Sequence, residues 1–71
     1  MQAAEVDYSE IVKSFESMSP KKAAELIEYW DEKDAIVLLS RMKNDAMTAI
    51  LEKMTPETAA NLALAITKIK N

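Results

Sequence analysis

The chain has 71 residues, 49% of them apolar, with no glycine, cysteine or histidine and a net charge of −3. This length suits one small domain, and the lack of glycine favours helices over tight hairpins or phosphate-binding loops. The lack of cysteine and histidine removes thiolate metal sites and the commonest catalytic base. We therefore expect a single all-α domain over residues 1–71 that is not an enzyme.

Charge is distributed unevenly along the chain. Residues 1–34 carry nine acidic and four basic side chains, a net −5, whereas residues 35–71 carry three acidic and five basic side chains, a net +2. The overall negative charge argues against a nucleic-acid partner. No apolar run approaches the ~18 residues that a bilayer-spanning helix needs. We expect no membrane contact by the domain itself.

The first helix is predicted over residues 8–17. Asp7, followed three residues later by Glu10, is typical of a capping box at a helix start. The apolar residues that follow recur at i, i+3, i+4 and i+7, as on one face of a helix. Residues 1–6 show no such pattern, and we expect them to fray.

Two helices begin with a hydroxyl residue followed by proline. Ser19-Pro20 predicts a helix over 20–29, and Thr55-Pro56 predicts another over 56–69. The hydroxyl can cap the free amides of the first turn, and proline at the first helical position has no amide to leave unpaired.

Two further helices are predicted between them. Asp31 is the expected cap of a helix over 32–41, whose middle holds five apolar residues in a row. A helix that is apolar nearly all round is usually buried, so this one should be central. The next helix is predicted over 44–53. Asn44 is its better cap chemically, whereas the register of the repeat puts the cap at Lys43.

The helices form a 12-residue repeat, each unit closed by a large apolar residue: Met18, Trp30, Met42 and Met54. Helices of ~10 residues are unstable alone, but stacked units can bury one another's apolar faces. The inward positions of the repeat predict the following core: Tyr8, Ile11, Val12, Phe15, Ala23, Leu26, Ile27, Ala35, Leu38, Leu39, Ala46, Met47, Ile50, Leu51, Ala59, Leu62, Ala63, Ile66 and Ile69. Three apolar residues do not fit this pattern: Tyr29, Val37 and Leu64.

Capped helices that restart every 12 residues, as in MSPKKAAELIEYW and MTPETAANLALAI, resemble the MgtE N-terminal-domain superfamily. The resemblance covers Asp7 to Ile69 and implies a right-handed superhelix of about five short helices. Members of the superfamily include the cytosolic gate domain of MgtE magnesium channels, parts of the flagellar switch protein FliG, and the C-terminal domain of MotE. Trp30, Asp31-Glu32 and Lys43-Asn44 depart from the usual pattern.

Within that superfamily the chain is most similar to the MotE-like C-terminal domain, because its length fits and it ends soon after the last repeat. The resemblance implies the C-terminal fragment of a longer chain, a periplasmic flagellar-motility chaperone that binds a motor protein such as MotC. A homo-oligomer would form through residues outside this fragment. The alternatives are a cytoplasmic Mg²⁺-sensing gate domain of an MgtE-type channel and a FliG-like flagellar adaptor.

Acidic side chains gather around the junction of the second and third predicted helices. Glu28, Asp31 and Glu32 are the core of this cluster, and carboxylate oxygens suit Mg²⁺. A cap and a helix amino terminus explain Asp31 and Glu32 more simply, and no glycine-containing loop is present to wrap an ion. We therefore expect no metal site and no cofactor.

Five residues are candidates for a partner-binding surface. Leu64, flanked by Ala60, lies opposite the inward stripe of the last helix, where a terminal repeat should be polar. Tyr29 lies outside the inward pattern as well. Lys21 and Lys22 occupy the first turn of a helix, where the helix dipole disfavours positive charge. Isolated exposed side chains and a solvated face are the simpler alternative.

Overall fold

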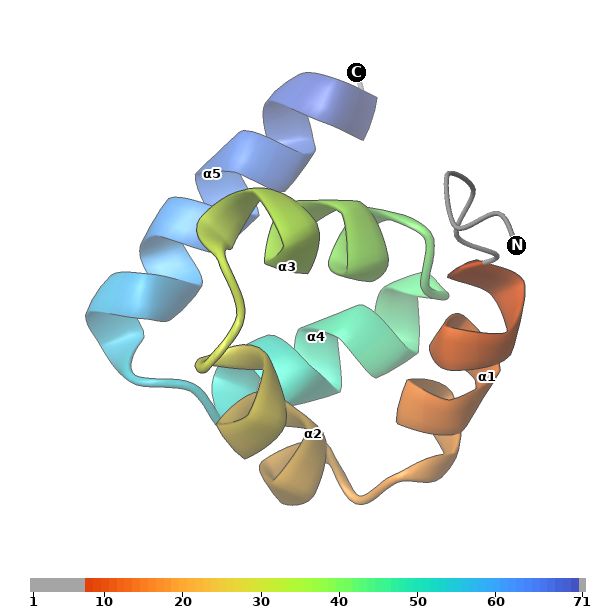
Figure 1. Ribbon diagram of the computed structural model, residues 1–71. Coiled ribbons are helices and arrows are strands. Elements are labelled where there is room, and N and C mark those ends of the chain that lie inside the picture. The colour runs from red at the N-terminus through yellow and green to blue at the C-terminus, as the bar shows by residue number, and fades with distance from the viewer. Residues whose placement is uncertain (1–7, 71) are drawn as a thin grey trace.

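The computed structural model describes residues 8–70, with side chains described as far as Ile69. Over that range the chain forms helices and no strand, which confirms the all-α prediction (Figure 1). The elements are α1 (Tyr8–Ser17), α2 (Pro20–Ile27), α3 (Glu32–Ser40), α4 (Asn44–Glu52) and α5 (Pro56–Lys70). The predicted fraying of residues 1–6 and the predicted Asp7 cap lie outside the described residues. None of the described helices is long and apolar enough to cross a membrane.

Backbone hydrogen bonds repeat with the 12-residue period. At the helix starts, a backbone amide donates to the carbonyl four residues earlier in the pairs Ala23–Ser19, Ala35–Asp31, Met47–Lys43 and Ala59–Thr55. At the helix ends, an amide donates to the carbonyl three residues earlier in the pairs Met18–Phe15, Trp30–Ile27, Met42–Leu39 and Met54–Leu51. Bonds over three residues tighten the last turn and end a helix. They stop α2 at Ile27, two residues before its predicted end.

Helices α2 and α3 begin differently. The Ser19 side chain accepts a hydrogen bond from the Lys22 backbone amide at 3.3 Å, which confirms the predicted cap of α2. Asp31 occupies the cap position of α3, but its side chain accepts no capping hydrogen bond. The prediction that the Asp31 carboxylate caps α3 is therefore wrong, although the helix starts where expected.

Helices α4 and α5 are capped by carboxylates from distant helices. Glu16 Oε2 accepts from the Lys43 backbone amide at 2.9 Å, and Glu28 Oε2 accepts from the Thr55 backbone amide at 2.9 Å. Each contact spans 27 residues, and the two are 12 residues apart. Of the two possible caps for α4, the one given by the register is correct, because Lys43 is the cap residue and Asn44 lies inside the helix.

Each helix packs mainly against the next but one along the chain. Helix α1 packs on α3, α2 on α4 and α3 on α5, with a further contact between α4 and α5. Helix α3 thus lies between α1 and α5, as expected for the central helix (Figure 1). The right-handed turn of the stack stays a prediction.

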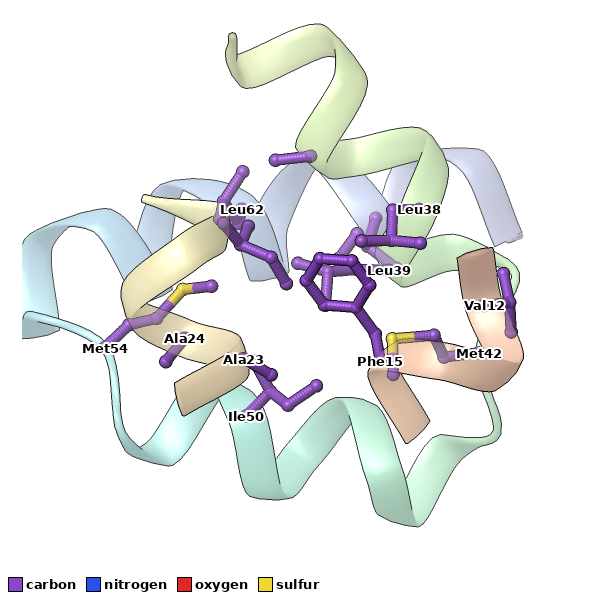
Figure 2. Close-up of a cluster of buried hydrophobic side chains, with 13 residues drawn as sticks. Val12, Phe15, Ala23, Ala24, Leu38, Leu39, Met42, Ile50, Met54 and Leu62 are labelled. Atoms are coloured by element: carbon purple, nitrogen blue, oxygen red, sulfur yellow. The ribbon is translucent and has the colours of Figure 1, made fainter. Parts of the chain in front are cut away.

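The core is a single cluster of apolar side chains (Figure 2). Its buried members are Val12, Phe15, Ala23, Ala24, Ile27, Ala35, Leu38, Leu39, Met42, Ile50, Met54, Leu62 and Ile66. Within the described range no polar side chain is buried. Trp30 is half-buried, and its ring meets Phe15 edge to face with centroids 5.5 Å apart.

Most predicted core positions are buried or half-buried, but two are wrong. Leu26 is 39% exposed, and Ala24, which the repeat did not include, is buried in its place. Helix α2 therefore turns its two alanines inward, and its leucine lies at the edge of the packed face. Ile69 is 58% exposed because α5 is longer than α3 and continues beyond it (Figure 1).

Candidate functional site

A hollow lies where the α2–α3 junction faces α5. Its volume is about 180 Å³. The residues around it are Ile27, Glu28, Trp30, Glu32, Ala35, Thr58, Asn61 and Leu62. Ile27, Ala35 and Leu62 are buried and form an apolar floor, whereas Glu28 and Glu32 are exposed. The hollow therefore has oxygen-bearing side chains at its rim and apolar side chains at its base.

Three elements place the polar side chains of this hollow. Glu28 follows directly after α2, and Glu32 is the first residue of α3. Thr58 and Asn61 are three residues apart on α5, so they lie on the same helical face. Because α3 packs against α5, that face comes opposite the two glutamates.

Glu28 has a structural role at this site. Its Oε2 atom lies 2.9 Å from the Thr55 backbone nitrogen and 3.5 Å from Thr55 Oγ1. From the sequence, Glu28 was expected to be a solvated glutamate or, as the alternative, a metal ligand, and this cap was not predicted. The signal was present, because Glu16 and Glu28 share one position of the repeat, as do Lys43 and Thr55.

The acidic cluster considered from the sequence is divided in two by the fold. Glu28 and Glu32 line the hollow described above, whereas Asp31 lines a different hollow together with Asp34. Among the described residues, no group of three or more acidic side chains is arranged to hold a metal ion. Mg²⁺ commonly keeps several waters and uses one or two protein carboxylates. Glu28 and Glu32 line the same hollow and could supply at most two carboxylates, with Glu28 Oε2 already accepting from the Thr55 amide, so they do not form a complete coordination sphere.

The five candidate partner residues lie on or next to two helices. Lys21 and Lys22 are exposed in the first turn of α2, and Tyr29, just after that helix, is 90% exposed. Ala60 is exposed on α5, where Leu64 is 59% exposed. The structure therefore separates these residues into an α2 group and an α5 group.

Comparison with protein families finds one match. A family model described as "MgtE intracellular N domain" matches residues 2–69 of the chain. Comparison with curated proteins and with solved structures finds no match. The family match supports the superfamily resemblance over nearly the whole chain. It does not support the closer likeness to MotE.

The expected function as a periplasmic MotE-like chaperone acting on MotC is therefore wrong. The family match points instead to the cytosolic domain of magnesium channels, which was the alternative. The MotE-like assignment rested on the length of the chain and on the position of its last repeat. Those features describe the fold, and a shared fold does not fix a function.

Proposed function

We propose that the chain is the intracellular regulatory domain of an MgtE-type magnesium channel, because it belongs to the MgtE intracellular N domain family. In this role it senses Mg²⁺ by binding it and catalyses no reaction. The observation that carries the proposal is the family match over residues 2–69. The hollow with Glu28 and Glu32 is the place where sensing would occur.

The geometry of the hollow supports a partly hydrated Mg²⁺ ion that this domain shares with another part of the channel. Two exposed glutamates can attract a divalent cation, while the remaining positions of its octahedron are filled by water or by another part of the channel. An ion held this way favours the arrangement in which both parts contribute ligands. Mg²⁺ would then shift the population of channel states by its difference in affinity between them.

A chimeric channel tests the regulatory role. The chain replaces the N domain of an MgtE-type channel, and Mg²⁺ influx is measured at low and at high internal Mg²⁺. We expect the chimera to conduct at low Mg²⁺ and to close as Mg²⁺ rises. A chimera whose influx ignores internal Mg²⁺, while the parent channel responds in the same cells, would contradict the proposal.

Variants of the isolated chain test the position of the ion. Nuclear magnetic resonance (NMR) titration with MgCl₂, at constant ionic strength, should shift the amide signals around Glu32 and Asn61. Glu32→Gln should weaken these shifts, because it removes one of the two carboxylates. Glu57→Gln is the matched control, since Glu57 is exposed in the first turn of α5 and outside the hollow. Equal weakening by both variants would mean that only general charge attraction is present.

Metal removal distinguishes sensing from folding. The core is one apolar cluster, and the described residues include no group of three or more acidic side chains placed to hold a metal ion. We therefore expect EDTA to leave the helical circular dichroism signal unchanged. Loss of helicity on adding EDTA would show that an ion is structural instead.

A further inference from the structure

One position of the 12-residue repeat becomes more exposed from each end of the stack to the other. It is occupied on the five helices in turn by Val12, Ala24, Ile36, Thr48 and Ala60. The residues on α1 and α2 are buried, the one on α3 is half-buried, and those on α4 and α5 are exposed. The position three residues later changes in the same direction, from buried on α1, α2 and α3 to half-buried on α4 and α5.

The packing order of the helices accounts for this trend. Each helix packs on the next but one, and within residues 8–70 no such follower exists for α4 or α5. Helix α5 lies at one edge of the fold (Figure 1). The side of α4 and α5 that a follower would cover is here called the open face, and it consists of Thr48, Glu52, Ala60 and Leu64, which are all exposed. Each helix contributes two of these residues at i and i+4, so each pair shares one side of its helix.

The open face carries a glutamate at a position that elsewhere caps a later helix. Glu16, Glu28 and Glu52 occupy the same position of the repeat. Glu16 accepts from the Lys43 amide and Glu28 from the Thr55 amide, both at 2.9 Å and both 27 residues away. Glu52 is the last residue of α4, and among the described residues its carboxylate forms no hydrogen bond or ion pair.

The remaining helix between them shows when this position needs an acceptor. Ser40 occupies it on α3, and the residue 27 positions later, Thr67, lies inside α5 and not at a helix start. The Ser40 hydroxyl instead donates to the Val37 carbonyl of its own helix at 2.9 Å. The position thus holds a glutamate on α1 and α2, where a later helix start takes the carboxylate, and a serine on α3, where none does. Glu52 is an acceptor of the first kind without its helix.

The described chain does not supply that helix. Helices α2 to α5 begin 12 residues apart, at Pro20, Glu32, Asn44 and Pro56. A sixth helix on this spacing would begin at Lys68, but α5 continues to Lys70. The chain therefore leaves the repeat within α5, and we assign the missing helix to a separate partner protein.

We propose that the open face binds the amino-terminal end of one amphipathic helix of a partner protein. An amide at the start of that helix donates to the Glu52 carboxylate, as the amides at the starts of α4 and α5 donate to Glu16 and Glu28. The first amides of a helix lack partners within it and carry partial positive charge, so a carboxylate is the matching acceptor. The apolar side of the partner helix covers Ala60 and Leu64, of which Leu64 is 59% exposed. The proposal is independent of Mg²⁺ sensing, because no residue of the open face lines the hollow with Glu28.

A synthetic peptide with the sequence of residues 54–70 is the probe. In the intact chain this sequence forms a helix whose start is capped by Glu28, so it has the required chemistry. NMR titration of the full chain, with the acetylated peptide raised to about 2 mM, should shift the amide signals around Glu52, Ala60 and Leu64. A peptide of the same composition in scrambled order should shift them much less, because it has no apolar side and no helix start.

Two variants of the chain test the two parts of the contact separately. Glu52→Gln removes the charged acceptor and Leu64→Ala removes apolar surface, and each should raise the Kd for the probe by at least about threefold. Both side chains are exposed, so both variants should keep the parent's circular dichroism spectrum. Glu57→Gln is the matched control, since it makes the same charge change on α5 outside the open face, and its Kd should equal the parent's.

Four results would overturn the proposal. The first is the absence of shifts at the highest probe concentration, and the second is equal weakening by Glu52→Gln and Glu57→Gln. The third is a set of shifts centred on Glu28 and Thr55, which would mean that the probe replaces the chain's own α5. The fourth comes from sedimentation equilibrium of the parent chain alone, which should be monomeric at about 1 mM. An oligomer that Glu52→Gln dissociates would show that a second copy occupies the open face instead of a partner protein.

Discussion

Helices α3 and α5 are built from the same repeat, yet they bury different fractions of their apolar residues. Leu38 and Leu39 of α3 are both 0% exposed, whereas Leu64 and Ile69 of α5 are 59% and 58% exposed. Helix α3 has α1 on one side and α5 on the other, whereas α5 ends the described stack. Burial in this fold therefore depends on where a helix lies in the stack, and residue type alone does not decide it.

The largest effect should come from the centre of α3. Leu38→Ala should lower the free energy of unfolding by about 2–5 kcal/mol, because it removes a fully buried side chain and leaves a cavity. Leu64→Ala is the matched control and should change it by less than about 0.5 kcal/mol. Urea denaturation measures both. A loss below about 1 kcal/mol for Leu38→Ala would show that α3 is not the centre of the fold.

A smaller loss should follow from enlarging a residue where helices approach closely. Ala23 is 0% exposed, so Ala23→Leu must push α2 away from its neighbours at a cost of about 1–3 kcal/mol. Ala60→Leu makes the same change on the exposed side of α5 and should be nearly neutral. Thermal unfolding of the two variants, followed by circular dichroism, makes the comparison. Equal melting temperatures would mean that the α2 packing has room for a larger side chain.

Much of this difference between helices could be predicted from the sequence. The 12-residue period gave the helix starts, and five successive apolar residues identified α3 as central. The position of Leu26 could not be predicted, because Ala24 and Leu26 both lie near the edge of the inward stripe. Which of them turns inward depends on how α2 packs against α4, a tertiary contact.

The candidate site was less predictable for a similar reason. Glu28 and Asp31 are close in sequence, but the turn between α2 and α3 sends them into different hollows. The caps from Glu16 and Glu28 join residues 27 positions apart, so a search for local capping patterns misses them. The sequence indicated such a contact only through the repeat, in which the two glutamates share one position and the two helix starts share another.

The two distant caps predict equal and independent effects. Glu16→Gln and Glu28→Gln should each lower the free energy of unfolding by about 1 kcal/mol, because a charged acceptor at a helix amino terminus is replaced by a neutral one. The two sites share no partner, so the double variant should lose the sum. Glu57→Gln, at a first-turn position of α5 without a distant contact in the described structure, is the control. A double variant no less stable than either single variant would show that the two caps are coupled and do not act independently.

The smallest effect is expected at the outer face of α5. Leu64→Glu should shift the melting temperature by less than about 3 °C, since a change within ±0.5 kcal/mol moves a domain of this size by only a few degrees. The exposed leucine contributes little burial, and the new carboxylate would lie four residues before Lys68 on the same face. A Glu–Lys pair at that spacing contributes about 0.2–0.5 kcal/mol, which offsets part of the lost apolar contact. Differential scanning calorimetry of the parent, Leu64→Glu and the combination of Leu64→Glu with Lys68→Ala separates these two contributions. A fall of more than about 8 °C in Leu64→Glu alone would place Leu64 in the core and would make α5 as fully covered as α3.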